Sequence, residues 1–263
     1  MGFFSLEGRV ALVTGGNRGI GRGIAQGLAA HGASVALAAR TRSQLDEAAV
    51  SIASSGGEAW AVEMDIADLS SVKQGVEAVV GHYGHIDILV NNAGMNIRED
   101  LVEVTEEHYD RIMSVNLKGL YFLTQAVARH MIPRRQGKII NIGSLTTGIS
   151  LDKVSVYTCT KGAVGQLTKA QAVELGPHNI QANAICPGFI VTSLTEKLWA
   201  DPTMRKWGEG RVALGRLGTP ADLAGTAVFL ASSASDYVTG QLIYVDGGYM
   251  AGEHWPLPPP RQA

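Results

Sequence analysis

Short apolar runs alternate with segments of helical periodicity along almost the whole chain, and this alternation limits the possible folds most. The run 10–13 is continuously apolar, as expected for a strand buried on both faces. Ile20, Ile24 and Leu28 then recur at every fourth position, which indicates that a helix follows the strand. Repeated strand–helix–strand order predicts a parallel sheet covered by helices on both faces.

The same pattern continues to the end of the chain and predicts an α/β fold with a doubly wound, Rossmann-type sheet, since right-handed crossovers leave few other topologies. The helix that begins near Thr105 is expected to end by about Met131, because Pro133 follows. Seven strands are predicted, at residues 8–14, 34–39, 58–63, 87–90, 138–142, 180–185 and 242–245.

Length and composition favour one domain over residues 1–263, since single α/β domains of about 250 residues are common. The hydrophobic share of 46% and the charged share of 17% exclude global disorder. A net charge of −2 provides no strong positive field that would attract nucleic acid. No apolar run is long enough for a membrane span, and Glu7 and Arg9 interrupt the N-terminus where a signal peptide would be apolar. Two cysteines make no disulfide framework, so a cytoplasmic protein is expected.

A glycine-rich segment lies between the first strand and the first helix. Gly15, Gly19 and Gly21 follow Thr14 at the carboxyl end of the strand, where open α/β sheets bind their ligands. Glycines there permit a tight turn and bring backbone N–H groups and the positive helix end close to a pyrophosphate. The sequence therefore predicts a dinucleotide site at this turn.

Three polar residues near the fifth strand carry acid–base chemistry. Tyr157 and Lys161 are four positions apart and so share one helix face, while Ser144 ends the fifth strand. A carbonyl that accepts hydride must also be protonated, and a tyrosine whose pKa is lowered by a nearby ammonium can supply the proton. Ser144 can donate a hydrogen bond to the same oxygen.

Together these motifs resemble the short-chain dehydrogenase/reductase family, whose signature T-G-x-x-x-G-x-G matches Thr14 to Gly21. The resemblance covers all but about the last dozen residues. Asn91 to Gly94 matches the family's N-N-A-G motif, and Pro187-Gly188 with Thr192 matches its P-G-x-x-x-T motif. Two departures are Cys159, where the family often has alanine, and Gly143, where serine is frequent. Cys159 is expected to be a small core residue on a buried helix.

The resemblance implies an enzyme that transfers hydride between a nicotinamide cofactor and a CH–OH group. It implies that Lys161 also holds the nicotinamide ribose and that Asn116 supports a water chain for proton relay. The catalytic residues carried over are Asn116, Ser144, Tyr157 and Lys161. The cofactor residues are Gly15, Asn17, Arg18, Gly19, Ile20, Arg40, Asp65, Ile66, Asn91, Ala93, Gly94, Tyr157, Lys161, Pro187, Gly188, Ile190 and Thr192.

The end of the second strand predicts a preference for NADP(H), with NAD(H) possible. An acidic residue at this position would bind the ribose hydroxyls of NAD, but none occurs before Asp46. Arg40 follows the strand directly, and Arg18 lies in the glycine turn. Arginine suits recognition of a 2′-phosphate.

The substrate is less constrained. Several stretches, including 129–132 and 178–181, resemble the sugar-acid and polyol branch of the family, such as gluconate 5-dehydrogenases. In that branch an arginine matches Arg98, which could bind a substrate carboxylate beside Ser144 and Tyr157. The alternatives are a 3-oxoacyl-(acyl-carrier-protein) reductase, with Arg129, Lys169 and the pair 134–135 as its basic surface, or a general carbonyl reductase. A non-catalytic dinucleotide sensor is a further alternative that the intact polar residues disfavour.

Three other expectations concern the ends and the assembly of the chain. Residues 192–210 are expected to form a substrate lid, whose apolar residues either line the substrate or pack as an ordinary helix face. Residues 252–263 form a proline-rich tail of open role. The resemblance implies a homotetramer, no metal is predicted, and His82 and His85 are interpreted as part of a solvated turn.

Overall fold

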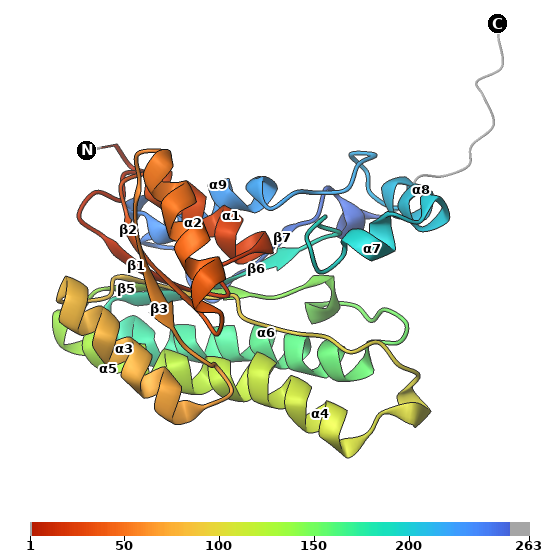
Figure 1. Ribbon diagram of the computed structural model, residues 1–263, viewed down its shortest axis with the longest axis horizontal. Helices are drawn as coiled ribbons and strands as arrows, with labels where there is room; N and C mark the ends of the chain where they lie inside the picture. Colours follow the sequence, from red (N-terminus) through yellow and green to blue (C-terminus); the bar gives the residue numbers. More distant parts are fainter. Residues whose placement is uncertain (1, 253–263) are drawn as a thin grey trace, which may run out of the picture.

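A parallel sheet forms the middle layer of the structure, which is a computed structural model that describes residues 2–252 (Figure 1). The seven strands lie in the order β3-β2-β1-β4-β5-β6-β7, and every neighbouring pair is parallel. This confirms the predicted fold class. The strands are β1 (Val10–Thr14), β2 (Ser34–Ala39), β3 (Glu58–Glu63), β4 (Ile88–Asn91), β5 (Gly137–Ile142), β6 (Ile180–Pro187) and β7 (Leu242–Val245).

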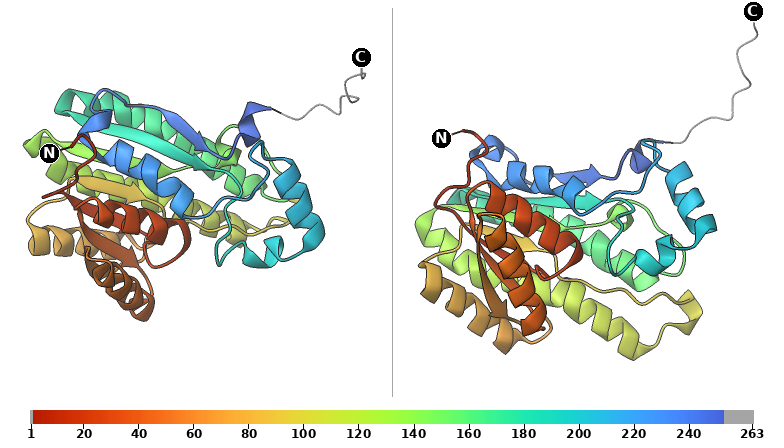
Figure 2. Two further views of the ribbon diagram at one scale, coloured as in Figure 1. Left: turned by 90° about the horizontal axis from the view of Figure 1, so that it is seen from above. Right: turned by 45° about the horizontal axis from the view of Figure 1, so that its top comes forward.

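Helices cover both faces of the sheet, as Figures 1 and 2 show. One face carries α1 (Gly19–Ala30), α2 (Arg42–Ser54) and α9 (Ala221–Ala231). The opposite face carries α3 (Leu69–Tyr83), α5 (Leu120–Arg134) and α6 (Ser155–Leu175), with α4 (Glu106–Met113) leading into α5. Two short helices, α7 (Glu196–Trp199) and α8 (Pro202–Gly210), lie beyond the carboxyl ends of β6 and β7.

Strand β1 shows why the apolar runs become buried strands. Its side chains alternate between the two faces, so Ala11 and Val13 pack under α1 and α9, whereas Val10 and Leu12 pack under α3 and α5. All four are buried. A strand covered on both faces needs apolar residues at successive positions, and this accounts for the continuous run.

The α4–α5 region differs from its sequence prediction. The helix does not end by Met131 but continues through Pro133 to Arg134. Because Pro133 lies in the last turn, the helix loses a backbone bond only where it is about to end. A π-helical segment, Ser114–Gly119, also separates α4 from α5, and a π-helical segment gives no signature in the apolar periodicity.

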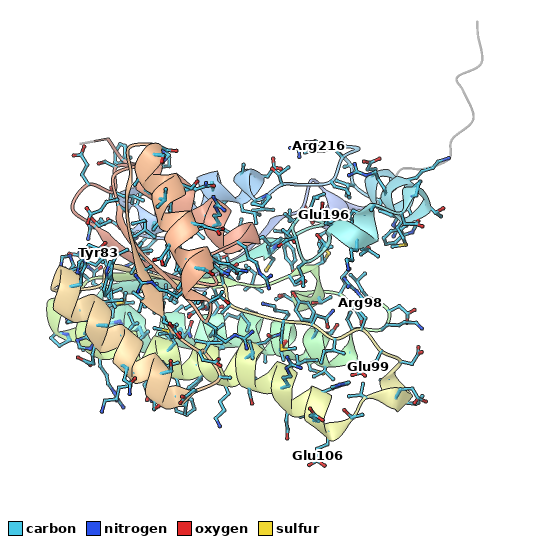
Figure 3. The ribbon with its side chains drawn as sticks, viewed as in Figure 1. Tyr83, Arg98, Glu99, Glu106, Glu196 and Arg216 are labelled. Carbon is cyan, nitrogen blue, oxygen red and sulfur yellow. The ribbon has the colours of Figure 1, made fainter. Side chains whose placement is uncertain are left out.

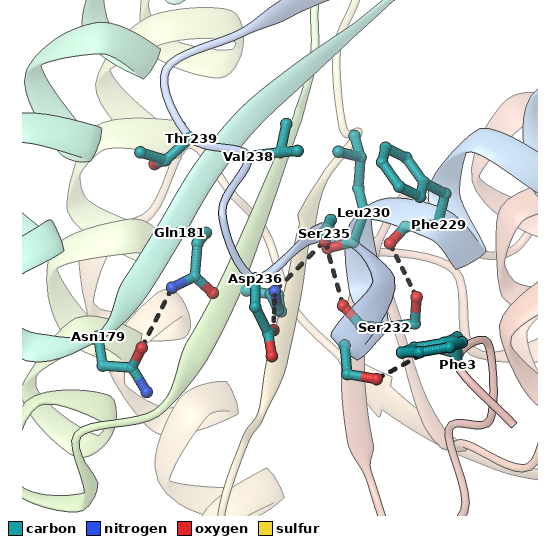
Figure 4. Close-up of polar contacts among 12 residues, drawn as sticks. Phe3, Asn179, Gln181, Phe229, Leu230, Ser232, Ser235, Asp236, Val238 and Thr239 are labelled. Atoms are coloured by element: carbon teal, nitrogen blue, oxygen red, sulfur yellow. Dashed lines mark hydrogen bonds and ion pairs between the residues drawn. The ribbon is translucent and has the colours of Figure 1, made fainter. Parts of the chain in front are cut away.

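Polar contacts fix the connection between α9 and β7 (Figure 4). The Ser235 hydroxyl is buried and lies 3.0 Å from the Leu230 carbonyl oxygen, to which it donates. The Ser232 hydroxyl donates to the Phe229 carbonyl oxygen at 2.9 Å. These bonds satisfy carbonyls at the end of α9 and hold the chain that leads into β7. No helix among residues 2–252 is long and apolar enough to cross a membrane.

A buried carboxylate joins four segments at the amino ends of the central strands. Asp87 is 2% exposed, and its oxygens accept bonds from the Val10 N–H at 3.0 Å, Arg134 at 2.9 Å and Gln136 at 3.1 Å. His85 lies 3.0 Å from the same carboxylate. Burial raises the pKa of Asp87, but the bonds from Val10 and Arg134 outweigh it and hold this pKa below its usual value.

Replacing this carboxylate is expected to destabilise the fold. Asp87→Ala leaves the Val10 N–H without an acceptor and should lower the free energy of unfolding by about 3 kcal/mol at neutral pH. Because the pKa of Asp87 is lowered in the folded state, its stabilisation is present above the unfolded pKa and is lost as the pH falls through the folded pKa. Urea unfolding should therefore show a difference in the free energy of unfolding between wild type and variant that narrows below about pH 4. Equal free energies of unfolding at neutral pH would contradict this role.

Candidate active site

The glycine turn leaves an open helix end at the carboxyl edge of β1. Gly15 and Gly19 have φ values of +62° and +54°, which side chains rarely adopt. A Cβ on Gly21 would overlap the Gly15 carbonyl oxygen, so the turn and α1 can approach only with glycine there. Arg18 precedes α1 without a side-chain cap, which leaves the first N–H groups of the helix free for an anion.

Thr14 connects this turn to the segment after β4. Its hydroxyl donates to the Val90 carbonyl oxygen at 3.2 Å and accepts the N–H groups of Asn92 and Ala93 at 3.0 and 3.1 Å. The Asn92 amide donates in turn to the Thr14 carbonyl oxygen at 2.8 Å. β1 and β4 are adjacent at the point where the strand order reverses, so this network shapes the crevice in which such sheets bind ligands.

Asn91 supplies an unpaired acceptor at the end of β4. Its Nδ2 donates to Thr124 Oγ1 and to Asn141 Oδ1, both at 2.9 Å. Its Oδ1 is buried without a partner among the described residues. An orphaned acceptor beside the glycine turn fits a ligand rich in hydroxyl donors.

Two arginines, one in the glycine turn and one directly after β2, have no ion-pair partner within residues 2–252. Arg18 and Arg40 are both exposed, at the glycine turn and directly after β2. Asp46 is already engaged, because Arg42 Nε lies 2.9 and 3.1 Å from its two oxygens. The glycine turn and the end of β2 thus each present an uncommitted guanidinium group, and Asp46 is not free to repel an anion there, which suits a phosphate.

Two further predicted cofactor positions lie at the end of β3. Asp65 turns its carboxylate back to the Ala67 N–H at 2.9 Å, and its own N–H donates to Ser71 Oγ at 3.0 Å. Ile66 is 8% exposed and packs against Gly119 of the π-helical segment. The segment after β3 is therefore held next to the helix that follows Asn116.

Asn116 lies in the π-helical segment and is 1% exposed. Its Oδ1 accepts the Met95 N–H at 2.8 Å, and its Nδ2 donates to the Met95 carbonyl oxygen at 2.9 Å and to Thr160 Oγ1 at 3.3 Å. It thereby joins the loop after β4 to α6, one residue before Lys161. The predicted water relay through Asn116 stays a prediction.

Ser144, Tyr157 and Lys161 converge where β5 ends against α6. The Lys161 Nζ donates to the carbonyl oxygen of Ile142, the last residue of β5, at 2.7 Å. The same Nζ lies 5.5 Å from the centre of the Tyr157 ring. The Ser144 side chain hydrogen-bonds to Tyr157, so all three predicted residues share one site.

Burial has the largest effect on the pKa values of Tyr157 and Lys161. It raises the pKa of Tyr157, which the Ser144 hydrogen bond and the positive charge of Arg98 partly offset. The expectation that a nearby ammonium lowers this pKa was therefore wrong, because burial dominates. Burial also lowers the pKa of Lys161 to about 8. At neutral pH the site therefore holds a protonated phenol beside an ammonium that is close to losing its proton.

Arg98 is held in a tethered loop beside Tyr157. Lys153 fixes this loop through its carbonyl oxygen, which accepts the Glu99 N–H at 3.1 Å, and through a 3.0 Å ion pair with Asp100. Glu99 also lies 2.9 Å from His108. In the view of Figure 3, Arg98 lies between the layer of α4 and α6 and helix α7. An exposed guanidinium close to Tyr157 can bind an anionic substrate at the reacting group.

The predicted lid is packed onto Phe189 by aromatic contacts. Trp199 and Trp207 lie with ring centres 5.2 and 5.5 Å from the Phe189 ring, and Tyr249 lies 5.0 Å from it. Trp199 is buried, whereas Leu194 is 64% exposed. The two tryptophans therefore pack on the protein itself, and the chain between Thr192 and Thr195 lies nearest the glycine turn, with Thr192 against Gly19.

Comparison with known proteins shows to which family a chain with this geometry belongs. A family model described as enoyl-(acyl carrier protein) reductase matches residues 15–250. Gluconate 5-dehydrogenase of Gluconobacter oxydans is 45% identical over 245 residues, which cover 93% of this chain and 96% of the relative. The chain belongs to the short-chain dehydrogenase/reductase family.

Other members of the family are nearly as similar. 3-Oxoacyl-(acyl-carrier-protein) reductase of Thermotoga maritima is 40% identical over 243 residues, which cover 92% of this chain and 98% of the relative. Among solved structures, gluconate 5-dehydrogenase from Burkholderia cenocepacia in complex with NADP and tartrate superimposes with a TM-score of 0.92 at 40% identity. The match covers 95% of this chain and 98% of that chain.

Some family-based expectations differ in the structure. Cys159 is exposed on α6 and not a core residue, so the prediction of a buried position was wrong. The four-residue spacing from Ser155 places it on the outer face of the helix, and one substituted residue gives no signal of which face it occupies.

His82 stacks on Trp60 with ring centres 4.2 Å apart, whereas His85 pairs with Asp87. All but the first residue of the tail predicted for 252–263 lies outside the described residues.

Sequence reasoning also missed residues that build the site. Asn92 lies inside the family motif but was not singled out, and its contacts with Thr14 emerge only from the folded strands. Gln44 lies on α2, where its Oε1 accepts the Asn17 amide at 2.6 Å across the glycine turn. Thr147 accepts the Ser144 N–H at 3.1 Å. No local pattern marks Gln44 or Thr147, because each contact joins segments that only the fold or a tight turn brings together.

Proposed function

We propose that this chain is an NADP(H)-dependent oxidoreductase that transfers hydride between the nicotinamide and a CH–OH group of a sugar acid. The convergence of Ser144, Tyr157 and Lys161 at the open end of β5 carries the proposal for the reaction. The charge of Arg98 beside Tyr157 and the similarity to gluconate 5-dehydrogenases support the substrate class.

The roles of the side chains follow from their bonds. Bound NADPH would supply the hydride to the carbonyl carbon, or NADP⁺ accept it from the alcohol. Tyr157 gives its phenol proton to the carbonyl oxygen during reduction and takes it back during oxidation. Ser144 donates a hydrogen bond to that oxygen, because its Oγ already accepts the Thr146 N–H at 3.1 Å and its own proton stays available. Lys161 supplies positive charge beneath the Tyr157 ring.

The cofactor residues proposed from the sequence would line one crevice at the carboxyl ends of the strands. Gly15, Asn17, Gly19 and Ile20 would lie at the pyrophosphate, with Arg18 and Arg40 at the 2′-phosphate. Asp65, Ile66, Asn91, Ala93 and Gly94 would bind the adenosine side and the middle of the cofactor, and Pro187, Gly188, Ile190 and Thr192 the nicotinamide side. The structures solved with NADP among the relatives support this choice of cofactor.

Fatty-acyl reduction is the alternative that the Thermotoga relative favours. An acyl carrier protein would need the basic residues predicted for this role, but two of them are engaged. Arg134 donates to Asp87 at 2.9 Å, and Arg135 donates to the Pro177 carbonyl oxygen at 3.0 Å. These contacts disfavour the carrier-protein surface. The second alternative is a non-catalytic dinucleotide sensor. It is disfavoured because Ser144, Tyr157 and Lys161 are all present at the open carboxyl end of β5.

The direct test compares two ketones with the pure protein and NADPH. Turnover of 5-keto-D-gluconate well above that of an acetoacetyl thioester is expected. The reverse preference would assign the chain to fatty-acyl reduction, and turnover of neither would overturn the proposed sugar-acid substrate.

The chain is further proposed to form a homotetramer in the cytoplasm. Exposed Tyr109, Tyr121 and Phe122 gather on the outer side of α4 and α5, beside an open hollow that Met113 and Leu167 help to line. An apolar surface of this kind fits the family's helix-to-helix subunit contact. Light scattering should give a tetramer, and a monomer would contradict the assembly.

Removal of the phenol hydroxyl should abolish turnover without affecting the binding of cofactor. Tyr157→Phe is expected to lower kcat at least about a hundredfold, because no other group at the site delivers the proton. NADPH affinity, measured by fluorescence titration, should stay within about twofold, since the variant keeps the Tyr157 ring and most of the proposed cofactor contacts are made by other residues. Near-normal kcat in this variant would refute the assignment of Tyr157.

The two arginines at the end of β2 give a matched pair of variants. Arg40→Ala should raise KM for NADP⁺ by about 10- to 100-fold and leave KM for NAD⁺ nearly unchanged, because it removes a charged hydrogen bond to the 2′-phosphate. Arg42→Ala is the control, since Arg42 is engaged with Asp46. Equal effects of both variants on the NADP⁺/NAD⁺ preference would contradict the role of Arg40.

Arg98 is expected to bind the substrate carboxylate. Arg98→Gln should raise KM for D-gluconate about 10- to 100-fold, and Arg98→Lys should recover only part of the affinity because an ammonium cannot bind a carboxylate through two parallel bonds. Steady-state kinetics with a polyol that lacks the carboxylate provide the control. The same increase in KM for that polyol would show that Arg98 acts by other means.

A further inference from the structure

The turn that carries Ser144 is closed by reciprocal bonds with Thr147. The Ser144 N–H donates to Thr147 Oγ1 at 3.1 Å, and the Thr147 N–H donates back to the Ser144 carbonyl oxygen at 3.0 Å. The Thr146 N–H donates to Ser144 Oγ at 3.1 Å. The arrangement is a capping box around a short 3₁₀ turn, Leu145–Thr147. The direction of the Ser144 hydroxyl therefore depends on this turn.

The Thr147 hydroxyl also lies beside a residue of the neighbouring strand. The sulfur of Cys186, which lies in β6 and is fully buried, and Thr147 Oγ1 both face the same side of Gly143. Burial raises the pKa of the Cys186 thiol, and the Thr147 hydroxyl partly offsets this. The bond from the Ser144 N–H and the packing against Cys186 together restrict the Thr147 side chain.

The methyl group of Thr147 reaches a third element. A Cβ on Gly165 would come within 2.5 Å of Thr147 Cγ2, so the methyl packs directly on α6 one turn beyond Lys161. Thr147 thus touches the turn after β5, strand β6 and the helix that carries Tyr157 and Lys161. Through Thr147, the turn that carries Ser144 is in contact with both β6 and α6.

These contacts explain Gly143, where the family frequently has serine. A Cβ on Gly143 would lie 2.7 Å from Cys186 Sγ and 2.9 Å from Thr147 Oγ1. Its φ is not positive, so glycine is needed for space and not for backbone conformation. Gly143, Thr147 and Cys186 are therefore one packed unit beneath Ser144.

We propose that Thr147 is a positioning residue for Ser144, and that Cys186 and Gly143 fix the rotamer through which it acts. The proposal rests on the oxidoreductase function proposed above. The Thr147 hydroxyl holds the Ser144 backbone, while the Thr147 methyl packs on α6. The bond made by the Thr147 hydroxyl directs the Ser144 hydroxyl toward Tyr157 and the substrate oxygen, where a displacement of about 1 Å costs about a hundredfold in rate.

Two variants of Thr147 separate its hydroxyl from its methyl. Thr147→Val keeps the methyl on Gly165 and removes the hydroxyl, so kcat should fall about 10- to 100-fold while NADP⁺ affinity stays within about twofold. Thr147→Ser keeps the hydroxyl and should restore most of kcat. Equal losses in both variants, or wild-type kcat in Thr147→Val, would overturn the proposal.

A second measurement does not depend on the substrate. Ultraviolet titration of the tyrosines, with Tyr157→Phe subtracted, reports the ionisation of Tyr157 alone. Because the Ser144 hydrogen bond lowers the pKa of Tyr157, Thr147→Val should shift this ionisation to higher pH and Thr147→Ser should not. An unchanged titration in Thr147→Val would overturn the positioning role. A shift without turnover of any ketone by the wild type would instead refute the proposed function and retain the positioning role.

Discussion

The buried bond from Lys161 to the Ile142 carbonyl oxygen determines the arrangement of the rest of the site. It joins the helix that carries Tyr157 to the strand that ends just before Ser144, with a donor–acceptor distance of 2.7 Å. Lys161 is only 5% exposed, so its charge is costly to hold there and the bond cannot be replaced by water. The position of the phenol and the ammonium relative to the end of β5 depends on this contact.

A second constraint acts at the point where the strand order reverses. Thr14 and Asn92 tie β1 to the segment after β4 and keep the glycine turn open toward the helix end. The crevice for a dinucleotide and the acid–base group thus lie on the same edge of one sheet, on either side of β4. The position of the cofactor and the position of the reacting oxygen are both fixed by parallel strands that end at the same level.

The fold could be predicted well from the sequence, and the site only in part. Apolar runs marked the strands, and β2, β3 and β7 were predicted with their observed bounds. The motif residues were predicted because family resemblance marks them. Residues that support them leave no such signal: Thr147 bonds to Ser144 and packs beside Cys186 of another strand, and Gln44 bonds to Asn17 from another helix. The π-helical segment around Asn116 was missed because apolar periodicity does not register one extra residue in a turn.

The central claim is that burial poises Lys161 beside a protonated Tyr157. Its most direct test is the pH dependence of a single turnover of NADPH with a ketone substrate, followed by stopped-flow absorbance. Since burial lowers the pKa of Lys161 to about 8, the ammonium is present below that pH and is lost above it. The account predicts a rate that falls as the pH rises through about 8, and a slow, pH-independent residual rate in Lys161→Met. A wild-type rate that stays level through this range, or the same fall in Lys161→Met, would contradict it.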